Sequence, residues 1–236
     1  MVKIDLITGF LGSGKTTFIK KYAKYLMAQV MNIAILENDF GAVNVDMMLL
    51  KDLEGEQCEL EMVAGGCDAD CHRRRFKTKL IAMGMCGYDR VIVEPSGIFD
   101  VDEFFDVLRE EPLDQWYEIG SVITIMNAKL EDTLSEEAEY LLASEAANAG
   151  CVVLSRSQDA SPEEIAKTRA HLNCALQAVH CSRQFGDEII EKNWEDFTEQ
   201  DLERIQNSGY HVEDYTKLHF PEKEAVELQK ELSAEG

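Results

Sequence analysis

Residues 9–16 read Gly9-Phe10-Leu11-Gly12-Ser13-Gly14-Lys15-Thr16 and follow an apolar segment, Ile4-Asp5-Leu6-Ile7-Thr8, that is typical of a buried strand. Glycines allow the backbone to wrap around phosphate groups and to point its N–H groups at them. The lysine supplies a positive charge for the β and γ oxygens, and the threonine hydroxyl that follows it suits Mg²⁺. The stretch therefore predicts a phosphate-binding loop for a nucleoside triphosphate.

The residues that follow this loop have the spacing of a helix. Phe18, Tyr22, Tyr25 and Leu26 recur at intervals of three or four residues, which is the period of a buried helical face. The N-terminus of this helix, with its positive dipole end, would then lie under the phosphates. We expect six residues to contact the nucleotide, namely Gly12, Ser13, Gly14, Lys15, Thr16 and Thr17.

The composition indicates a sizeable core and excludes some partners. The chain has 236 residues, of which 45% are hydrophobic, enough for one domain with a small appendage. Its net charge of −22 opposes binding to a nucleic acid backbone or to an anionic membrane surface. We therefore expect neither nucleic acid nor a membrane as a partner.

The N-terminus and the cysteine content indicate a compartment. The chain starts Met1-Val2-Lys3 and enters the first predicted strand at once, so we expect no signal peptide. No apolar run reaches the ~18 residues that a membrane-spanning helix needs. A cytoplasmic location is therefore predicted, where the seven cysteines are interpreted as buried thiols or metal ligands.

Strand-like and helix-like segments alternate along the chain, which is typical of a parallel sheet covered on both faces. We predict an α/β fold of the P-loop NTPase type, with a mainly parallel sheet, helices on both faces and three α/β/α layers. Further strands are predicted at residues 32–36, 91–93, 122–126 and 151–154, with a weak one at 178–180. Helices are predicted at residues 72–85, 101–108, 135–148 and 161–173. The segment 57–62 alternates in period two and is interpreted as a hairpin arm.

The pattern weakens beyond about residue 182. Residues 1–182 are therefore predicted to form the nucleotide-binding domain, and residues 183–236 a short acidic C-terminal appendage packed on it. The aromatic residues of this appendage are spread among many acids, and they are Trp194, Phe197, Tyr210, Tyr215 and Phe220.

Carboxylates follow two of the predicted strands. Asp39 lies in the segment Glu37-Asn38-Asp39-Phe40-Gly41, and Glu94 lies in Val91-Ile92-Val93-Glu94-Pro95-Ser96-Gly97. The C-terminal ends of parallel strands line the ligand crevice, so these carboxylates can hold Mg²⁺ through water or orient the attacking water. Gly97 leaves a backbone N–H for the γ-phosphate. Taken alone each acid is an ordinary loop residue, but their positions after a phosphate loop favour the catalytic interpretation.

A cysteine-rich loop lies between those two segments. It reads Gly65-Gly66-Cys67-Asp68-Ala69-Asp70-Cys71-His72. Thiolate and imidazole groups suit Zn²⁺ and other borderline divalent ions, which makes Cys67, Cys71 and His72 candidate ligands. The spacing is not that of a structural zinc finger, so an open or transient site is expected. The alternative is a loop cysteine, an acidic turn and a helix that starts with His72.

These segments together resemble the CobW-type GTPases, a P-loop family that includes metal-insertion proteins and metallochaperones. The resemblance is carried by Ile7-Thr8-Gly9-Phe10-Leu11-Gly12-Ser13-Gly14-Lys15-Thr16-Thr17 and by Glu37-Asn38-Asp39-Phe40-Gly41, which is similar to the family's Asn-Glu-Phe-Gly loop. Gly66-Cys67 and Glu94-Pro95-Ser96-Gly97 match its Gly-Cys-x-Cys-Cys and Glu-x-Ser-Gly motifs. The resemblance covers about residues 2–173. It implies GTP hydrolysis, with Mg²⁺, that is coupled to handling Zn²⁺, Co²⁺ or Ni²⁺ or to loading a cofactor into a client enzyme.

The chain departs from the family pattern in its metal motif and in its length. Only Cys67 aligns directly with the metal motif, since the next thiol is displaced to Cys71. The chain also ends before the C-terminal domain of many relatives, and it is interpreted as a minimal form that lacks that domain.

The base-reading motif is altered as well. The family's Asn-Lys-x-Asp falls on Ser155-Arg156-Ser157-Gln158, so the resemblance makes Ser155, Arg156 and Gln158 candidate base contacts. An aspartate accepts two hydrogen bonds from guanine, whereas the Gln158 amide offers one acceptor and one donor. Asp159 would replace it if the loop shortens, and Asn127 stands where relatives usually carry Asp. Weaker discrimination between GTP and ATP is therefore expected.

Three functions are compatible with these observations. The first is a slow Mg²⁺-dependent GTPase or NTPase that acts as a metallochaperone or metal-insertion switch, with Lys15, Asp39 and Glu94 as catalytic residues. The second is a metal-free, nucleotide-gated activation or assembly factor for a cofactor-dependent enzyme. The third is a small-molecule kinase. The expected partners are the nucleotide and a client metalloenzyme or cofactor protein, with a homodimer as a further option.

Overall fold

The computed structural model describes residues 1–10, 12–39, 45–64, 69–95 and 101–218. The chain divides into two compact units. Unit 1 comprises residues 1–7 and 16–121, and unit 2 comprises residues 8–15 and 122–236.

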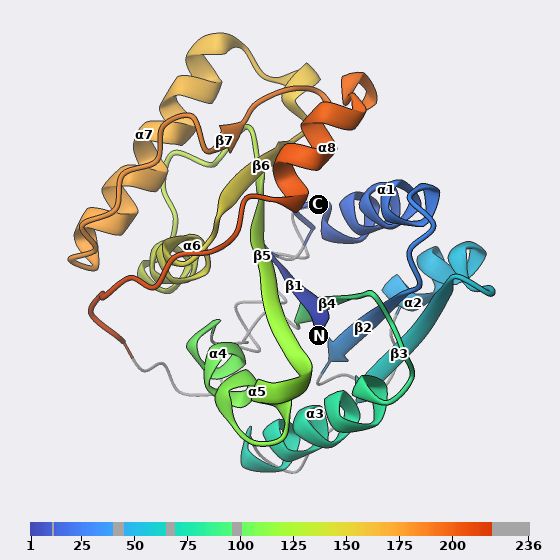
Figure 1. Ribbon diagram of the computed structural model, residues 1–236. Coiled ribbons are helices and arrows are strands. Elements are labelled where there is room, and N and C mark those ends of the chain that lie inside the picture. Colours follow the sequence, from blue (N-terminus) through green and yellow to red (C-terminus); the bar gives the residue numbers. More distant parts are fainter. Residues whose placement is uncertain (11, 40–44, 65–68, 96–100, 219–236) are drawn as a thin grey trace. The chain divides into compact units, whose positions relative to one another are not determined.

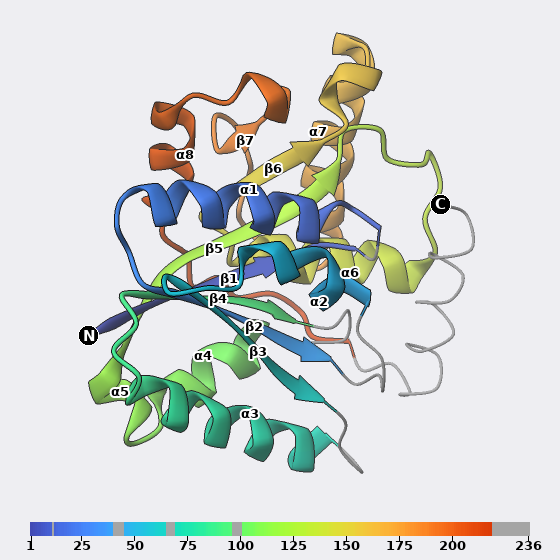
Figure 2. The ribbon, with the colours of Figure 1, turned by 90° about the vertical axis from the view of Figure 1, so that its right-hand side faces the viewer.

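Unit 1 is a parallel α/β layer structure. Its strands are β1 (Val2–Thr8), β2 (Ile33–Asp39), β3 (Cys58–Ala64) and β4 (Arg90–Pro95), in the order β3-β2-β4-β1. Every pair among these four strands is parallel. The helices are α1 (Lys15–Ala28), α2 (Val45–Leu50), α3 (Ala69–Gly84), α4 (Val101–Arg109) and α5 (Leu113–Trp116). Helices α1 and α2 lie on one face of these strands, and α3, α4 and α5 lie on the other (Figure 2).

A buried ion pair holds the strands of unit 1 together. The Asp5 carboxylate on β1 accepts two hydrogen bonds from the Arg90 guanidinium on β4, at 2.6 and 2.9 Å. It also accepts bonds from the Tyr22 hydroxyl on α1 and from the backbone N–H of Ser121, both at 2.8 Å. Burial opposes the charged form of Arg90, but the bonds and the charge of Asp5 outweigh burial, so the pKa of Arg90 is raised. The Asp5 carboxylate thus connects β1 to β4, to α1 and to the backbone of Ser121, the last residue of unit 1.

Unit 2 contains the remaining strands. They are β5 (Tyr117–Asn127, in unit 2 from Val122 onward), β6 (Cys151–Ser155) and β7 (Ile189–Ile190), with both pairs parallel. Helices α6 (Glu136–Ala147) and α7 (Pro162–Ala178) lie together on one side of these strands, and α8 (Glu199–Gln206) lies on the other (Figure 1). Helix α7 begins with a capping box of Ser161 and Glu164.

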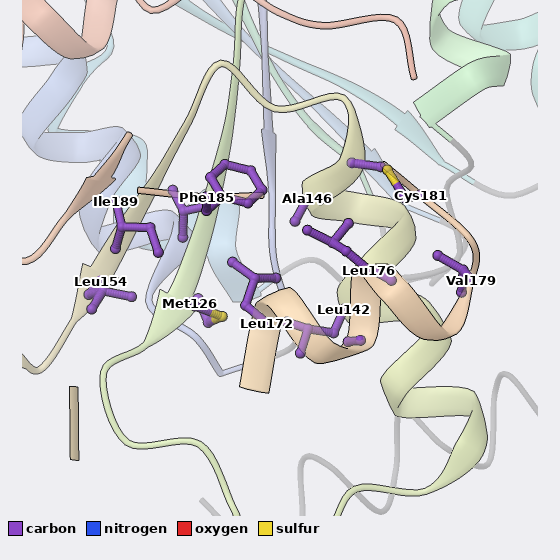
Figure 3. Close-up of a cluster of buried hydrophobic side chains, with 14 of the residues drawn as sticks. Met126, Leu142, Ala146, Leu154, Leu172, Leu176, Val179, Cys181, Phe185 and Ile189 are labelled. Atoms are coloured by element: carbon purple, nitrogen blue, oxygen red, sulfur yellow. The ribbon is translucent and has the colours of Figure 1, made fainter. Parts of the chain in front are cut away.

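Apolar side chains from these strands and helices form the core of unit 2 (Figure 3). They come from strands, helices and the segment before β7, and the largest are Met126, Leu142, Leu154, Leu172, Leu176, Phe185 and Ile189. The buried guanidinium of Arg183 donates to the carbonyl of Ala147 at 2.8 Å and lies over the Phe185 ring. Arg183 therefore satisfies the C-terminal end of α6, where backbone carbonyls lack helical partners.

The predicted parallel α/β fold is confirmed, but the predicted pairing of one strand and the existence of another are wrong. The segment 57–62 is no hairpin arm, because β3 pairs with β2 in parallel along its length. Residues 178–180 form no strand, because α7 runs to Ala178 and Val179 caps it. The last strand is instead β7. The boundary at residue 182 stays a prediction.

Within the described ranges, no helix is both long enough and apolar enough to span a membrane.

The phosphate loop in unit 2 is anchored to β5 through Thr8 and Gly9. The Thr124 hydroxyl gives its proton to the carbonyl of Glu145 at 3.0 Å, so in the 2.8 Å bond between the two threonine hydroxyls the donor is Thr8. Gly9 has φ +143°, and a Cβ at this position would lie 2.3 Å from the carbonyl oxygen of Ile125. Only glycine allows this approach of the two backbones.

The glycines of the loop should therefore differ in their tolerance of alanine. Gly9→Ala adds a clash with backbone to an unfavourable φ, and we expect it to lower the free energy of unfolding by about 3 kcal/mol or more. Gly12 also has a positive φ, +78°, but a Cβ there meets no atom within 4 Å. Gly12→Ala should cost only about 1–2 kcal/mol. Urea denaturation of the two nucleotide-free variants measures both losses, and equal losses would contradict the proposed close approach.

Candidate functional site

The phosphate loop of unit 2 is held in a wrapped conformation by its own lysine. The Lys15 ammonium group donates to the carbonyl oxygens of Gly9 at 2.8 Å and of Phe10 at 3.1 Å, and the residue is 8% exposed. The backbone N–H of Ser13 closes a turn onto the same Phe10 carbonyl at 3.0 Å. An ammonium group has three N–H donors, so one donor remains for a phosphate oxygen. The contact of Lys15 with the β and γ phosphate oxygens stays a prediction.

Two further loop residues have the geometry of a phosphate cradle. Gly12 and Gly14 have φ values of +78° and +98°, a conformation that turns backbone N–H groups toward a bound anion. The Ser13 side chain is buried, and its hydroxyl has no hydrogen-bond partner among the described residues. A loop with these glycine conformations and with bonded carbonyls at Gly9 and Phe10 is suited to phosphate.

The Mg²⁺ candidates lie in unit 1. The Thr16 hydroxyl donates to a carboxylate oxygen of Glu94 at 3.5 Å, and Glu94 is 4% exposed. Thr17, the next residue of α1, is exposed. A hydroxyl and a buried carboxylate at this separation are oxygen ligands of the kind that Mg²⁺ prefers, directly or through water. The residues present therefore fit the ion.

A second buried carboxylate, which the sequence analysis did not single out, lies beside Glu94. Glu37 on β2 is in register with Glu94 on β4, and it is 3% exposed. Residues in register on adjacent parallel strands point to the same face of the sheet. Asp39 ends β2, and its side chain lies outside the described residues. The register of β2 with β4 could have identified Glu37, but the motif drew attention to Asp39 instead.

The candidate base-reading segment follows β6 in unit 2. Ser155 is buried and its hydroxyl donates to the carbonyl of Met126 at 3.4 Å. Arg156 is exposed and has φ +56°, the left-handed conformation that non-glycine residues rarely adopt. This turn brings Gln158 into a short 3-10 helix, η2 (Ser157–Asp159), where it is exposed. The contacts of these residues with a base stay a prediction.

The transition-metal candidates are only partly described. Cys67 and Gly97 lie outside the described residues. Cys71 and His72 are in the first turn of α3, where Cys71 is half-buried and His72 is 3% exposed. In the part of the chain that the structure describes, no three His, Cys, Asp or Glu residues form a group that could hold a metal ion. The assignment of Cys67, Cys71 and His72 therefore stays a prediction.

A buried glutamate that sequence reasoning missed lies beside the phosphate loop. A cavity of about 180 Å³ in unit 2 is lined by Phe10, Gly12, Ser13, Thr124 and Glu145, among others. Burial raises the pKa of Glu145 to about 7, against the opposing charge of Lys15. Its position i+3 from Leu142 in the apolar stripe of α6 was the signal in the sequence. An acid in such a stripe is buried when the helix packs on a sheet.

The ionisation of Glu145 should make stability depend on pH. Its pKa is about 7 in the folded chain and near 4.5 when unfolded, so the stability that its protonated form contributes is complete below pH 4.5 and is lost as pH rises through 7. The loss is on the order of 3 kcal/mol at 1.36 kcal/mol per pH unit. Relative to the parent, Glu145→Gln should therefore become more stable with each step of a urea-denaturation series from pH 5 to 8.

An exposed acid of the same helix provides the control for this series. Glu136→Gln should leave the pH dependence unchanged, because the Glu136 side chain is exposed at the start of α6. If Glu145→Gln and the parent keep a constant difference from pH 5 to 8, the carboxyl of Glu145 does not titrate as described.

Comparisons with known proteins show which sequences and folds this chain resembles. The sequence model described as CobW/HypB/UreG, nucleotide-binding domain, matches residues 3–184. The zinc chaperone YeiR of Escherichia coli (strain K12) is 29% identical over 167 residues, which are 69% of this chain and 49% of YeiR. The zinc chaperone CobW of Pseudomonas aeruginosa is 23% identical over 214 residues, which are 76% of this chain and 56% of that protein. The chain spans about half the length of the curated relatives it matches.

Solved structures with the same fold include the Zn(II)-bound YjiA GTPase from E. coli and the signal recognition particle receptor FtsY from Elizabethkingia anophelis. The first has a TM-score of 0.53 at 17% identity and covers 96% of this chain and 69% of that one. The second has a TM-score of 0.52 at 14% identity and covers 97% and 65%. These likenesses concern the fold. Since the family model matches most of the sequence, the chain belongs to the CobW/HypB/UreG family of nucleotide-binding domains.

Proposed function

We propose that this chain is a Mg²⁺-dependent GTPase that acts as a metallochaperone or metal-insertion switch. The observation that carries the proposal is the state of the phosphate loop, in which Lys15 already bonds to the carbonyls of Gly9 and Phe10. A preorganised donor costs no rearrangement when charge develops on the phosphates. The family membership of residues 3–184 supports the same activity.

Different residues of the chain are proposed to bind the phosphates, to hold Mg²⁺ and to orient the attacking water. The loop N–H groups and the third N–H of Lys15 bind the phosphate oxygens, and Thr16 with Glu94 would hold Mg²⁺, which neutralises charge on the β and γ oxygens when bound. Asp39 and Glu94 are proposed to orient a water that attacks the γ-phosphorus. The bond from that phosphorus to the β–γ bridging oxygen then breaks, and GDP leaves with inorganic phosphate as the other product.

Slow turnover and imperfect base selection follow from the same residues. Lys15 is the one cation that we assign to the transferring phosphoryl group, and fast turnover normally needs a second positive charge from a partner. GTP is the proposed substrate, because one curated relative is named a zinc-regulated GTPase metalloprotein activator and one solved structure of the same fold is named a GTPase. The Gln158 amide accepts one hydrogen bond where an aspartate accepts two, so ATP should compete more than it does with an intact motif.

The proposed cargo is Zn²⁺, with Co²⁺ and Ni²⁺ as related ions. Three curated relatives carry the name zinc chaperone, and one solved structure of the same fold is described as Zn(II)-bound. Cys67, Cys71 and His72 are the proposed ligands, because thiolate and imidazole groups suit these ions. A client metalloprotein would then receive the ion.

A zinc titration with a competing chelator, under reducing conditions, tests this function. The parent should bind about one Zn²⁺ per chain, and Cys67→Ala should weaken binding at least tenfold, as loss of a ligand or its support does. Cys174→Ala is the matched control, because Cys174 is an exposed thiol on α7, and it should change nothing. GTP hydrolysis is measured on the same samples.

The other outcomes favour the other functions. GTP hydrolysis without zinc binding in the parent would favour a metal-free activation factor for a cofactor-dependent enzyme. Zinc binding that survives Cys67→Ala would refute the ligand assignment. Transfer of the γ-phosphoryl group to an acceptor other than water would indicate a small-molecule kinase.

A further inference from the structure

Trp194 touches the phosphate loop from a segment that no sequence motif marks. It begins the short 3-10 helix η3 (Trp194–Asp196), which follows β7 in unit 2. A Cβ placed on Gly14 would lie 3.2 Å from Cη2 and 3.7 Å from Cζ3 of the indole ring. The far edge of the indole ring therefore packs on the last glycine before Lys15.

The other edge of the same ring is bonded to the end of β6. The indole Nε1–H donates to the carbonyl oxygen of Leu154 at 2.8 Å. The Ser157 hydroxyl donates to that carbonyl too, at 3.3 Å. A carbonyl oxygen has two lone pairs, so Trp194 and Ser157 together use both. The Leu154 carbonyl thus joins the indole to the turn that contains Arg156 and Gln158.

We propose that Trp194 is a positioning residue for nucleotide recognition, which joins the phosphate loop to the base-reading segment through Gly14 and the Leu154 carbonyl. This inference rests on the proposed function, since it assigns the base to residues 155–158. Gly14 belongs to the loop that holds the phosphates, and Leu154 precedes Ser155 directly. A shift of the indole ring therefore changes the distance between the two ends of the nucleotide site.

The altered base motif makes the affinity for the base more dependent on how Trp194 positions this segment. With a Gln in place of the aspartate, the segment provides fewer acceptors for guanine, so its affinity for the base depends on how well the remaining groups are placed. Arg156 is held in a left-handed conformation, which is unfavourable for a side chain other than glycine and persists only when its surroundings impose it. The Leu154 carbonyl precedes Arg156 by two residues, and Ser157, one of its two donors, follows Arg156 directly.

Two ligands separate a positioning role from a general effect on the fold. GTP contacts both ends of the site, whereas inorganic tripolyphosphate contacts the phosphate loop alone. Trp194→Phe keeps an aromatic ring but loses the Nε1–H donor, and it should weaken Mg²⁺·GTP binding three- to tenfold, the effect of one hydrogen bond. Its affinity for Mg²⁺·tripolyphosphate should stay within twofold of the parent. Isothermal titration measures both affinities.

Trp116→Phe is the matched control and also supplies an optical signal. Trp116 lies on α5 in unit 1, where it packs near Gly84, and its replacement should leave both affinities unchanged. Trp194 is then the only tryptophan, since the chain has two, and its emission should change when Mg²⁺·GTP saturates the site. An unchanged emission would contradict the contact with the loop.

A double-mutant cycle tests the shared carbonyl. Ser157→Ala should weaken GTP binding selectively, as Trp194→Phe does. In the double variant the loss should differ at least threefold from the product of the two single losses, because both donors act on one acceptor. Additive losses, or equal losses for GTP and tripolyphosphate, would overturn the inference while the proposed function stands. A parent that binds neither ligand would refute the proposed function and the inference with it.

Discussion

The nucleotide site depends on the bonds from the Lys15 ammonium group to the carbonyls of its own loop. Without a donor these carbonyls would point into the loop and repel phosphate oxygens. The conformation also needs Gly9, because β1 must leave the sheet where its backbone meets Ile125. Thr8 and Thr124 then tie the start of the loop to α6 through the carbonyl of Glu145. These contacts give the loop a defined conformation, and donors that are fixed in place stabilise developing charge without a cost of rearrangement.

A net charge of −22 sets the conditions under which this loop works. A triphosphate is strongly anionic, so the chain as a whole repels the ligand that the loop attracts, and only short-range donors can overcome that repulsion. A second repulsion arises in unit 1, where the buried carboxylates of Glu37 and Glu94 lie side by side. A divalent cation relieves both repulsions at once. We therefore expect the acidic composition to make nucleotide binding depend on Mg²⁺.

The sequence predicted those parts of the structure that short segments determine. The phosphate loop, the start of α7 with Ser161 and the parallel α/β fold belong to this class, because spacing and capping residues fix them locally. The segment 57–62 was misassigned, since period-two alternation is the same in a hairpin arm and in the parallel strand β3. Residues 178–180 were predicted to form a strand. Val179 is instead the C-cap residue of α7, and it is apolar because it is buried there. Trp194 and Glu145 could not be placed, because their contacts with the loop join residues more than a hundred positions apart.

A metal-insertion switch of the proposed kind requires that the nucleotide and the metal cargo bias the same conformational equilibrium, and reciprocity between the two ligands tests this most directly. The measurement is the affinity for Mg²⁺·GTP with and without saturating Zn²⁺, together with the affinity for Zn²⁺ with and without saturating Mg²⁺·GTP. Linkage requires both affinities to change by the same factor. We predict a factor of at least five, which corresponds to about 1 kcal/mol of coupling. Tight binding of both ligands with no mutual effect would contradict the account, because the two sites would then act independently.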